Sequence, residues 1–179
     1  HTLWSWYKNL SSYFKIKGSK KLNWEPNLGY VLFCSSFENK IKNVSLAQSA
    51  IKNIKNTILI ELKGFQKSEI NLMLNASDML LVTSLSETGP IIVKEALSCN
   101  CPIVSTDVGD VKNMIKNVDN CYLTSYDVDQ LSEIIKKVIE LNIRSNGRKF
   151  IKKYDLKIIA ERVFKIYQQL KWNLNYLLK

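Results

Sequence analysis

The chain has 179 residues, of which 46% are hydrophobic, and this hydrophobic content excludes a disordered chain. Its six Gly and three Pro are too few for a collagen-like or low-complexity chain. A domain of this length buries enough apolar surface to fold without disulfides or a structural metal. The 26 Lys and Arg against 16 Asp and Glu give a formal net charge of +10, which either suits an anionic partner or reflects amino-acid composition alone. No run of basic residues is longer than two, which argues against a nucleic-acid-binding arm.

The chain begins with an aromatic and basic segment, residues 1–28, and then alternates between two apolar patterns. In chain order the patterns predict a strand at 30–34, a helix that Asn43 caps, a strand at 57–62, a short helix that Ser68 caps, a strand at 79–83, a helix at 90–97, a strand at 102–105, a short helix at 111–115, a strand at 122–123, a helix at 129–141 and a long terminal helix that Asp155 caps. This alternation predicts an α/β fold, a Rossmann-like parallel sheet with helices on both faces.

Two boundaries follow from this reading. The Rossmann-like domain is expected at 29–154, and the terminal helix, 155–179, is expected to pack on the domain or to extend from it. In such sheets ligands bind beyond the carboxyl ends of the strands. The loops in question are those at 34–43, 62–68, 83–90 and 105–111.

The loop after the third strand carries the features that predict a ligand. Gly89 allows close backbone approach and Pro90 suits a first helical position, so the helix start offers free N–H groups to an anion. Glu87 lies before this turn, and Glu95 lies within the helix. A phosphate flanked by polyols would suit both the helix start and the carboxylates. The plainer alternative is an ordinary first-turn carboxylate at Glu87 and a solvated one at Glu95.

The stretch from Ser84 onward resembles the group 1 family of retaining glycosyltransferases, which have the GT-B fold. The family has two glutamates separated by seven residues, in the context S-x-x-E-G-x-P-x-x-x-x-E-A-x-x-x-x-x-P-V-V-x-x-x-x-G. The residues that match are Ser84, Glu87, Pro90, Glu95, Ala96, Pro102, Ile103, Val104 and Gly109. Residues 75–81 resemble the family's helix-to-strand junction, and Lys42 resembles its phosphate-binding lysine. The match spans about 29–170 in the right order.

The resemblance implies a donor-binding domain, the C-terminal half of a GT-B enzyme, that takes a UDP- or GDP-linked sugar. It implies that Glu87 is catalytic beside the transferred sugar, that Glu95 accepts from the ribose hydroxyls, and that Lys42 holds the diphosphate with the helix start. The residues expected at that helix start are Thr88, Gly89, Pro90 and Ile91. The expected base-contacting loop is Gly64, Phe65 and Gln66. No metal or cofactor is expected, because a lysine supplies the cation.

Three departures from the family stand out. Phe37 takes the place of an Arg, and Thr88 takes the place of a Gly. Only one strand, 57–62, lies between the first helix and the Ser68 helix, where many members have two. The acceptor-binding domain is expected to be missing from this chain. The implied function is retaining glycosyl transfer to a saccharide or lipid-linked acceptor in polysaccharide or glycan biosynthesis, in the cytoplasm, with or without peripheral contact to the membrane.

Other interpretations remain beside this one. The alternative from a different functional class is a non-catalytic, basic Rossmann-type module that binds nucleic acid or an anionic membrane. With the family resemblance, no nucleic acid is expected as a partner. The aromatics of 4–24 either lie on a membrane or, as we favour, pack on the terminal helix near Phe164 and Tyr167. The four cysteines lack metal-ligand spacing and are expected to be buried free thiols. Asp110 is expected to cap a helix rather than hold a metal.

Overall fold

The computed structural model describes residues 15–177 and, within the last helix, side chains as far as Leu170. A helix at 15–21 comes first. The elements that follow are β1 (Gly29–Phe33), η1 (Lys40–Lys42), α2 (Val44–Ile51), β2 (Thr57–Glu61), α3 (Lys67–Ala76), β3 (Met79–Val82), α4 (Ile91–Ser98), β4 (Ile103–Thr106), α5 (Val111–Ile115), β5 (Cys121–Thr124), α6 (Val128–Leu141), α7 (Arg148–Ile151), η2 (Lys152–Tyr154) and α8 (Leu156–Leu177).

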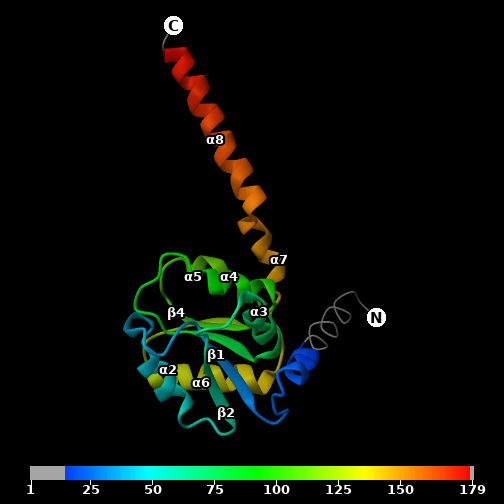
Figure 1. Cartoon of the computed structure of the whole chain (residues 1–179). Coiled ribbons are helices and arrows are strands. Elements are labelled where there is room, and N and C mark those ends of the chain that lie inside the picture. The colour runs from blue at the N-terminus through cyan, green and yellow to red at the C-terminus, as the bar shows by residue number, and fades with distance from the viewer. Residues whose placement is uncertain (1–14, 178–179) are drawn as a thin grey trace.

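Within the described residues, five parallel strands form one sheet in the order β2-β1-β3-β4-β5 (Figure 1). The register places Val31 of β1 opposite Leu59 of β2 on one side and opposite Met79 of β3 on the other. Strands β1, β3 and β4 are buried along their whole length, as continuous apolar runs predict for a sheet covered on both faces. The predicted α/β class with a parallel sheet is confirmed.

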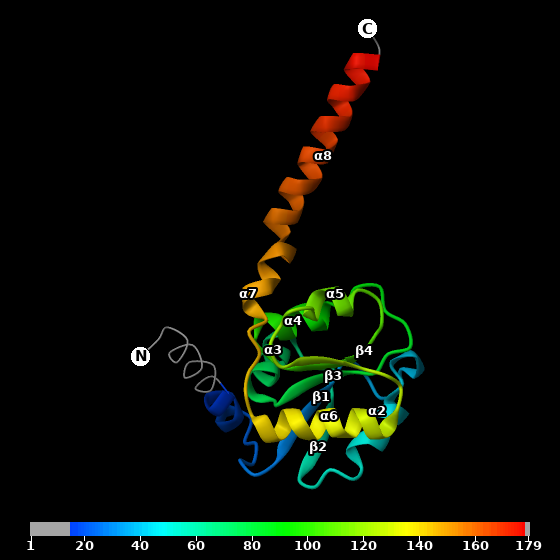
Figure 2. The ribbon, with the colours of Figure 1, turned by 180° about the vertical axis from the view of Figure 1, so that it is seen from behind.

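Two helical layers cover the sheet (Figure 2). Helices α2 and α6 pack on one face, against side chains such as Phe33 and Leu81, and helices α3, α4 and α5 pack on the other, against side chains such as Leu32 and Leu80. Neighbouring residues of a strand thus enter opposite cores, because side chains alternate along a strand. Each fully buried Leu or Phe contributes about 1.5–3 kcal/mol, so the two cores hold the strand ends in fixed positions.

The starts of the helices test the capping predictions. Gln66, not Ser68, caps α3, because its side chain accepts from the backbone of Glu69 while the Glu69 carboxylate accepts from the N–H of Gln66 at 2.7 Å. Asn43 does precede α2, but it has a left-handed conformation with φ of 52° and its side chain makes no capping bond. Asp155 caps α8 as predicted, since its Oδ1 accepts from the N–H of Lys157.

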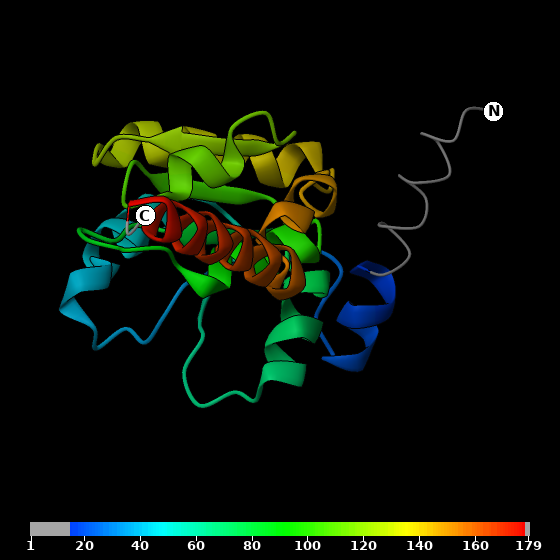
Figure 3. The same ribbon diagram turned by 90° about the horizontal axis from the view of Figure 1, so that it is seen from above.

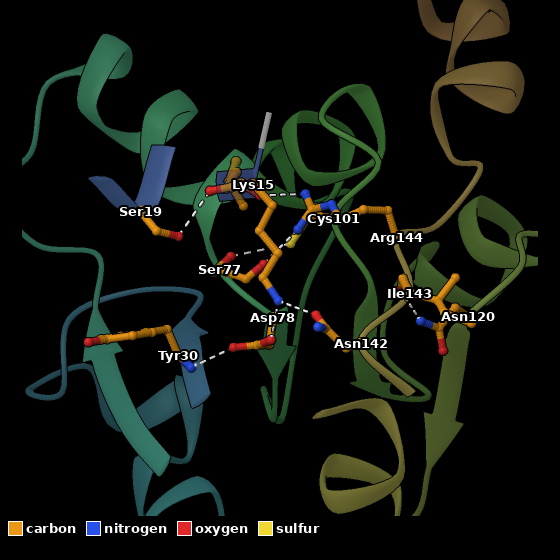
Figure 4. A network of polar contacts seen from close by, with 11 residues as sticks. Lys15, Ser19, Tyr30, Ser77, Asp78, Cys101, Asn120, Asn142, Ile143 and Arg144 are labelled. Carbon is orange, nitrogen blue, oxygen red and sulfur yellow. Dashed lines mark hydrogen bonds and ion pairs between the residues drawn. The ribbon is translucent and has the colours of Figure 1, made fainter. Parts of the chain in front are cut away.

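The helix at 15–21, which the sequence reading did not predict, packs against the amino ends of the strands. A Cβ on Gly18 would lie 3.0 Å from the Cβ of Ala76, which shows how closely this helix meets the end of α3. Lys15 donates to Asp78 at 2.6 Å, and the other oxygen of Asp78 accepts from the N–H of Tyr30 (Figure 4). This contact lies at the edge of the sheet opposite the carboxyl ends of the strands.

At the same edge, Arg144 joins the ends of two helices (Figure 4). Its guanidinium donates to the carbonyls of Ser77 at 2.6 Å and Leu74 at 2.7 Å, at the end of α3, and to that of Cys99 at 3.1 Å, at the end of α4. The last carbonyls of a helix have no partner within the helix. Arg144 therefore satisfies acceptors that two separate helices leave open.

Helix α8 rises from the face of the domain that α3, α4 and α5 cover (Figures 1 and 3). Its predicted apolar stripe is exposed, and the residues of the stripe are Leu156, Ile159, Val163, Ile166 and Leu170. The predicted packing of the N-terminal aromatics on this helix is wrong for Trp24, whose ring stacks on Tyr30 at 4.1 Å, while Phe164 and Tyr167 are exposed. The aromatics before residue 15 lie outside the described residues. No helix in the described part of the chain is long and apolar enough to cross a membrane.

All four cysteines are free thiols, and two of them, Cys99 and Cys101, are fully buried. Burial raises the pKa of Cys99 from 9.0 to about 11 and that of Cys121 to about 12. A rise of two units lowers the reactive thiolate fraction at pH 8 about 100-fold, so we expect slow alkylation of these thiols in the folded chain. Mass spectrometry after iodoacetamide treatment measures this rate, with the chain in urea as the control for full reactivity. Rapid modification of Cys99 in the folded chain would contradict its burial.

Candidate functional site

The site lies at the carboxyl ends of β1 and β3, where the strand order changes direction. After β1 the chain forms β2 on one side of β1, and it then crosses to form β3 on the other side of β1. In open α/β sheets a crevice forms at such a switch point, because the two connecting loops diverge. The loop after β1 leads to Lys42, and the loop after β3 leads to Glu87.

Three hydrogen bonds fix the backbone around Lys42 to the end of β3. The N–H of Leu85 donates to the carbonyl of Ile41 at 2.8 Å, and the buried hydroxyl of Thr83 lies 2.8 Å from the carbonyl oxygen of Lys42 and 3.0 Å from that of Asn43. The left-handed Asn43 ends η1 and starts α2 at the same point. The short helix η1 thereby presents Lys42 to the loop that carries Glu87.

Lys42 and Glu87, both predicted from the sequence, form an ion pair in this structure. The ammonium of Lys42 donates to Oε1 of Glu87, with the two side chains 19% and 10% exposed. The hydroxyl of Ser84 donates to the same oxygen at 2.7 Å. One carboxylate oxygen therefore accepts from a charged donor and from a neutral donor.

Two side chains from other parts of the chain hold Ser84 in place. Its carbonyl accepts from the phenol of Tyr126 at 2.9 Å and from the hydroxyl of Thr106 at 3.0 Å. Tyr126 comes from the loop before α6, and Thr106 ends β4. These bonds connect residues far apart in the chain, so no local pattern could reveal them, although Ser84 itself belongs to the matched motif.

Neither Cys34 nor Phe37 supplies a charged group to the site. Burial raises the pKa of Cys34 to about 11, so its thiol, 3.9 Å from the hydroxyl of Ser84, stays neutral and is no nucleophile. The ring of Phe37 packs at 5.4 Å from that of Phe33 and joins the core beneath α2. The position where the family resemblance expects an Arg thus supplies no cation.

Gly109 packs against the backbone of Glu87 and has a positive φ of 54°. A Cβ there would stand 2.5 Å from the carbonyl oxygen of Glu87 and 2.9 Å from its carbonyl carbon, closer than real Cβ atoms come. Only glycine allows both this backbone conformation and this close approach. The loop after β4 therefore packs directly against the backbone of Glu87.

The residues expected to meet a diphosphate lead into α4. Pro90 is buried and stands one position before the first helical residue, so it occupies the cap position rather than the predicted first position. Around it Thr88 is exposed, Gly89 borders open space, and Ile91 is 70% exposed. The first N–H groups of a helix lack helical partners, so this end of α4 offers donors beside the Lys42–Glu87 pair.

Glu95 points elsewhere: it lines a groove of about 490 Å³ between α3, α4 and α7. The groove is lined by Lys67, Asn71, Leu74, Ile91, Lys94, Glu95, Ser98, Arg148, Ile151, Lys152, Tyr154 and Asp155. Its lining includes Ile91, the first residue of α4 after the loop of Glu87, and Lys67, which directly follows the loop of Gly64, Phe65 and Gln66. The structure therefore places Glu87 with Lys42, and Glu95 in the adjoining groove.

Acidic residues at this edge have partners other than a metal. Asp107 pairs with Lys112 at 3.2 Å, and Oδ1 of Asp110 accepts from the side chain of Asn113 rather than capping α5. Among the described residues, no three His, Cys, Asp or Glu side chains gather closely enough to hold a metal ion.

Sequence comparison adds a family and a relative. The family model described as glycosyl transferases group 1 matches residues 58–155, more than half of the chain. A curated relative from Campylobacter jejuni, N,N'-diacetylbacillosaminyl-diphospho-undecaprenol alpha-1,3-N-acetylgalactosaminyltransferase, is 30% identical over 109 residues. That match covers 58% of this chain and 29% of the relative.

Three solved structures have a similar fold. Sucrose-phosphate synthase from Thermosynechococcus elongatus superposes with a TM-score of 0.77 at 17% identity, over 88% of this chain and 49% of that one. WaaG, a glycosyltransferase involved in lipopolysaccharide biosynthesis, gives 0.68 at 16%, over 86% and 50%. AviGT4, involved in avilamycin A biosynthesis, gives 0.56 at 14%, over 82% and 52%. The chain spans about half of each of these structures and less than a third of the curated relative.

Proposed function

Because the chain belongs to the glycosyl transferases group 1 family, we propose that it is the donor-binding half of a retaining glycosyltransferase. The membership confirms the resemblance in the Ser84–Gly109 region, and the fold is that of GT-B glycosyltransferase structures. The proposed donor is a UDP- or GDP-linked sugar. Family membership does not favour the alternative of a non-catalytic basic module for nucleic acid or a membrane.

The observation that carries the proposal is the placement of Lys42, Glu87 and the start of α4 around one switch point, with Glu95 in the groove that continues from it. A sugar nucleotide is a diphosphate with a polyol on each side. In the proposed pose Lys42 and the N–H groups near Gly89 and Ile91 hold the diphosphate. Glu87 faces the sugar hydroxyls, and Glu95 accepts from the ribose hydroxyls, with the base toward residues 64–66.

The same residues suit the proposed chemistry. When the bond between the sugar and the diphosphate breaks, negative charge develops on the departing diphosphate. A cation and helix N–H groups stabilise that charge more strongly than they stabilise the intact donor, which lowers the barrier. The cation is Lys42 itself, so the proposed reaction uses no metal and no cofactor. The acceptor hydroxyl attacks from the side that a second domain would form.

The acceptor follows from analogy with relatives. The Campylobacter protein acts, by its name, on an undecaprenol-linked saccharide, and WaaG takes part in lipopolysaccharide biosynthesis. For this chain we propose a saccharide or lipid-linked acceptor in polysaccharide or glycan synthesis, on the cytoplasmic side and with peripheral contact to the membrane. A second domain that binds the acceptor, as in the GT-B fold, would complete the proposed enzyme.

Thermal unfolding of the chain with UDP- and GDP-linked sugars tests donor binding. We expect one of these donors to raise the unfolding temperature, and we expect Lys42→Ala and Glu95→Ala each to reduce the rise strongly, because they remove the proposed diphosphate and ribose contacts. Lys112→Ala is the matched control, since it removes one exposed cation from the same edge and should keep the rise. If no nucleotide sugar protects the chain, while anionic vesicles bind it in a salt-dependent way, the basic-module alternative is correct.

A further inference from the structure

We propose that Glu87 competes with the diphosphate of the donor for Lys42, so that the empty site is closed by its own carboxylate. The inference rests on the proposed function for the identity of the ligand. It adds that donor affinity is set by an exchange of partners on one lysine. The carboxylate that faces the sugar in the loaded site is the counter-ion of the lysine in the empty one.

The Lys42–Glu87 pair holds the lysine in the empty site. Lys42 donates to Oε1 of Glu87, and in the described part of the chain Glu87 is the acidic residue within ion-pair distance of this lysine. Both side chains are mostly shielded from water, so salt screens their attraction less than it screens an exposed pair. A diphosphate at the start of α4 has to draw Lys42 away from this partner before it gains the cation.

The backbone that carries Lys42 is fixed. Thr83 and Leu85 fix the backbone of residues 41–43, so Lys42 reorients only through its side chain. Phe37 is packed into the core and offers no second cation to the diphosphate. The affinity of the site for a diphosphate thus depends strongly on how tightly Glu87 holds Lys42.

Glu87 keeps a hydrogen-bond donor after the exchange. The hydroxyl of Ser84 donates to the same Oε1 that Lys42 contacts, so the carboxylate keeps one donor when the lysine leaves. A diphosphate carries more negative charge than one carboxylate, which favours its capture of the lysine. The second oxygen of Glu87, which accepts no hydrogen bond from the described residues, is then available to sugar hydroxyls. Ser84 is therefore a positioning residue that makes the exchange less costly.

Isothermal titration of UDP and GDP into the chain and its variants tests this exchange. Glu87→Gln should bind the nucleotide about tenfold more tightly, since the amide releases the lysine. Ser84→Ala should bind it about threefold more weakly, because Glu87 then loses its remaining donor. A structural defect in Ser84→Ala is checked by its unfolding temperature. Asp107→Asn, which removes one negative charge from the same edge, should change affinity less than twofold.

The double variant separates competition from simple repulsion. In a Lys42→Met background the gain from Glu87→Gln should disappear. A gain in affinity that persists there would mean that Glu87 merely repels the phosphates, and it would overturn the inference. Equal affinities of Glu87→Gln and Asp107→Asn would also overturn it. In both of those outcomes the unchanged chain still binds nucleotide, so the proposed function stands. Absence of binding by the unchanged chain would overturn the proposed function and the inference together.

Discussion

Gly109→Ala is expected to lower the free energy of unfolding by about 3 kcal/mol. The left-handed backbone alone costs alanine about 1 kcal/mol, and the added Cβ would stand 2.5 Å from the carbonyl oxygen of Glu87, so the backbone of that loop has to move. For a chain of this size the loss corresponds to about 10 °C in the unfolding temperature. Calorimetry or circular dichroism during heating measures it.

Gly89→Ala is the matched control for this change in stability. Gly89 lies on the same loop as Glu87, but its φ is not in the left-handed region and no atom lies within 4 Å of the position of a Cβ. The same methyl group should therefore leave the unfolding temperature almost unchanged there. Equal stabilities of the two variants would mean that the loop of Glu87 does not rest on Gly109.

Arg144→Met is expected to destabilise the chain by a similar amount, about 3 kcal/mol. The change leaves the carbonyls of Leu74, Ser77 and Cys99 without their charged donor, and each such hydrogen bond contributes about 1.5–3 kcal/mol before discounting for partial exposure. Methionine keeps the length and apolar character of the side chain. Urea denaturation gives the free energy directly.

Arg148→Met provides the comparison. The guanidinium of Arg148 is exposed and donates to one carbonyl, that of Ser98 at 2.7 Å. Its loss should cost less than about 1 kcal/mol, since water can replace an exposed donor. Should both variants unfold at the same urea concentration, the contacts of Arg144 with the ends of α3 and α4 would not contribute to stability.

The sequence predicted the strands and most helices well, because those elements depend on local patterns. The runs at 79–83 and 102–105 are apolar in an unbroken way, which identifies a strand buried on both faces. The prediction that Ser68 caps α3 was wrong. A Ser fits the general preference for the cap position at the start of a helix, whereas the reciprocal bonds of Gln66 with Glu69 depend on side-chain length. The helix at 15–21 has no clear stripe and owes its position to contacts with Ala76 and Asp78.

The sequence predicted candidate residues of the site, but not the contacts between them. A motif gave Lys42, Glu87 and Glu95 as candidates, yet their spacing did not show that Glu87 would pair with Lys42 while Glu95 would line a groove. Such pairing depends on which loops the strand order brings together. Tyr126 illustrates the limit, since its bond to Ser84 joins residues that are 42 positions apart and carries no local signal.

The strand order also bears on how the chain can assemble while it is being made. β1 is synthesised first and β2 pairs with it; β3 then adds to its other side, and β4 and β5 follow outward in turn. Each new strand thus joins an edge that already exists, and none has to be inserted between two strands that have paired. Synthesis proceeds from the N-terminus and is slow compared with the formation of short-range structure. A nascent chain can therefore build this sheet, and with it the crevice between β1 and β3, before its last helices have left the ribosome.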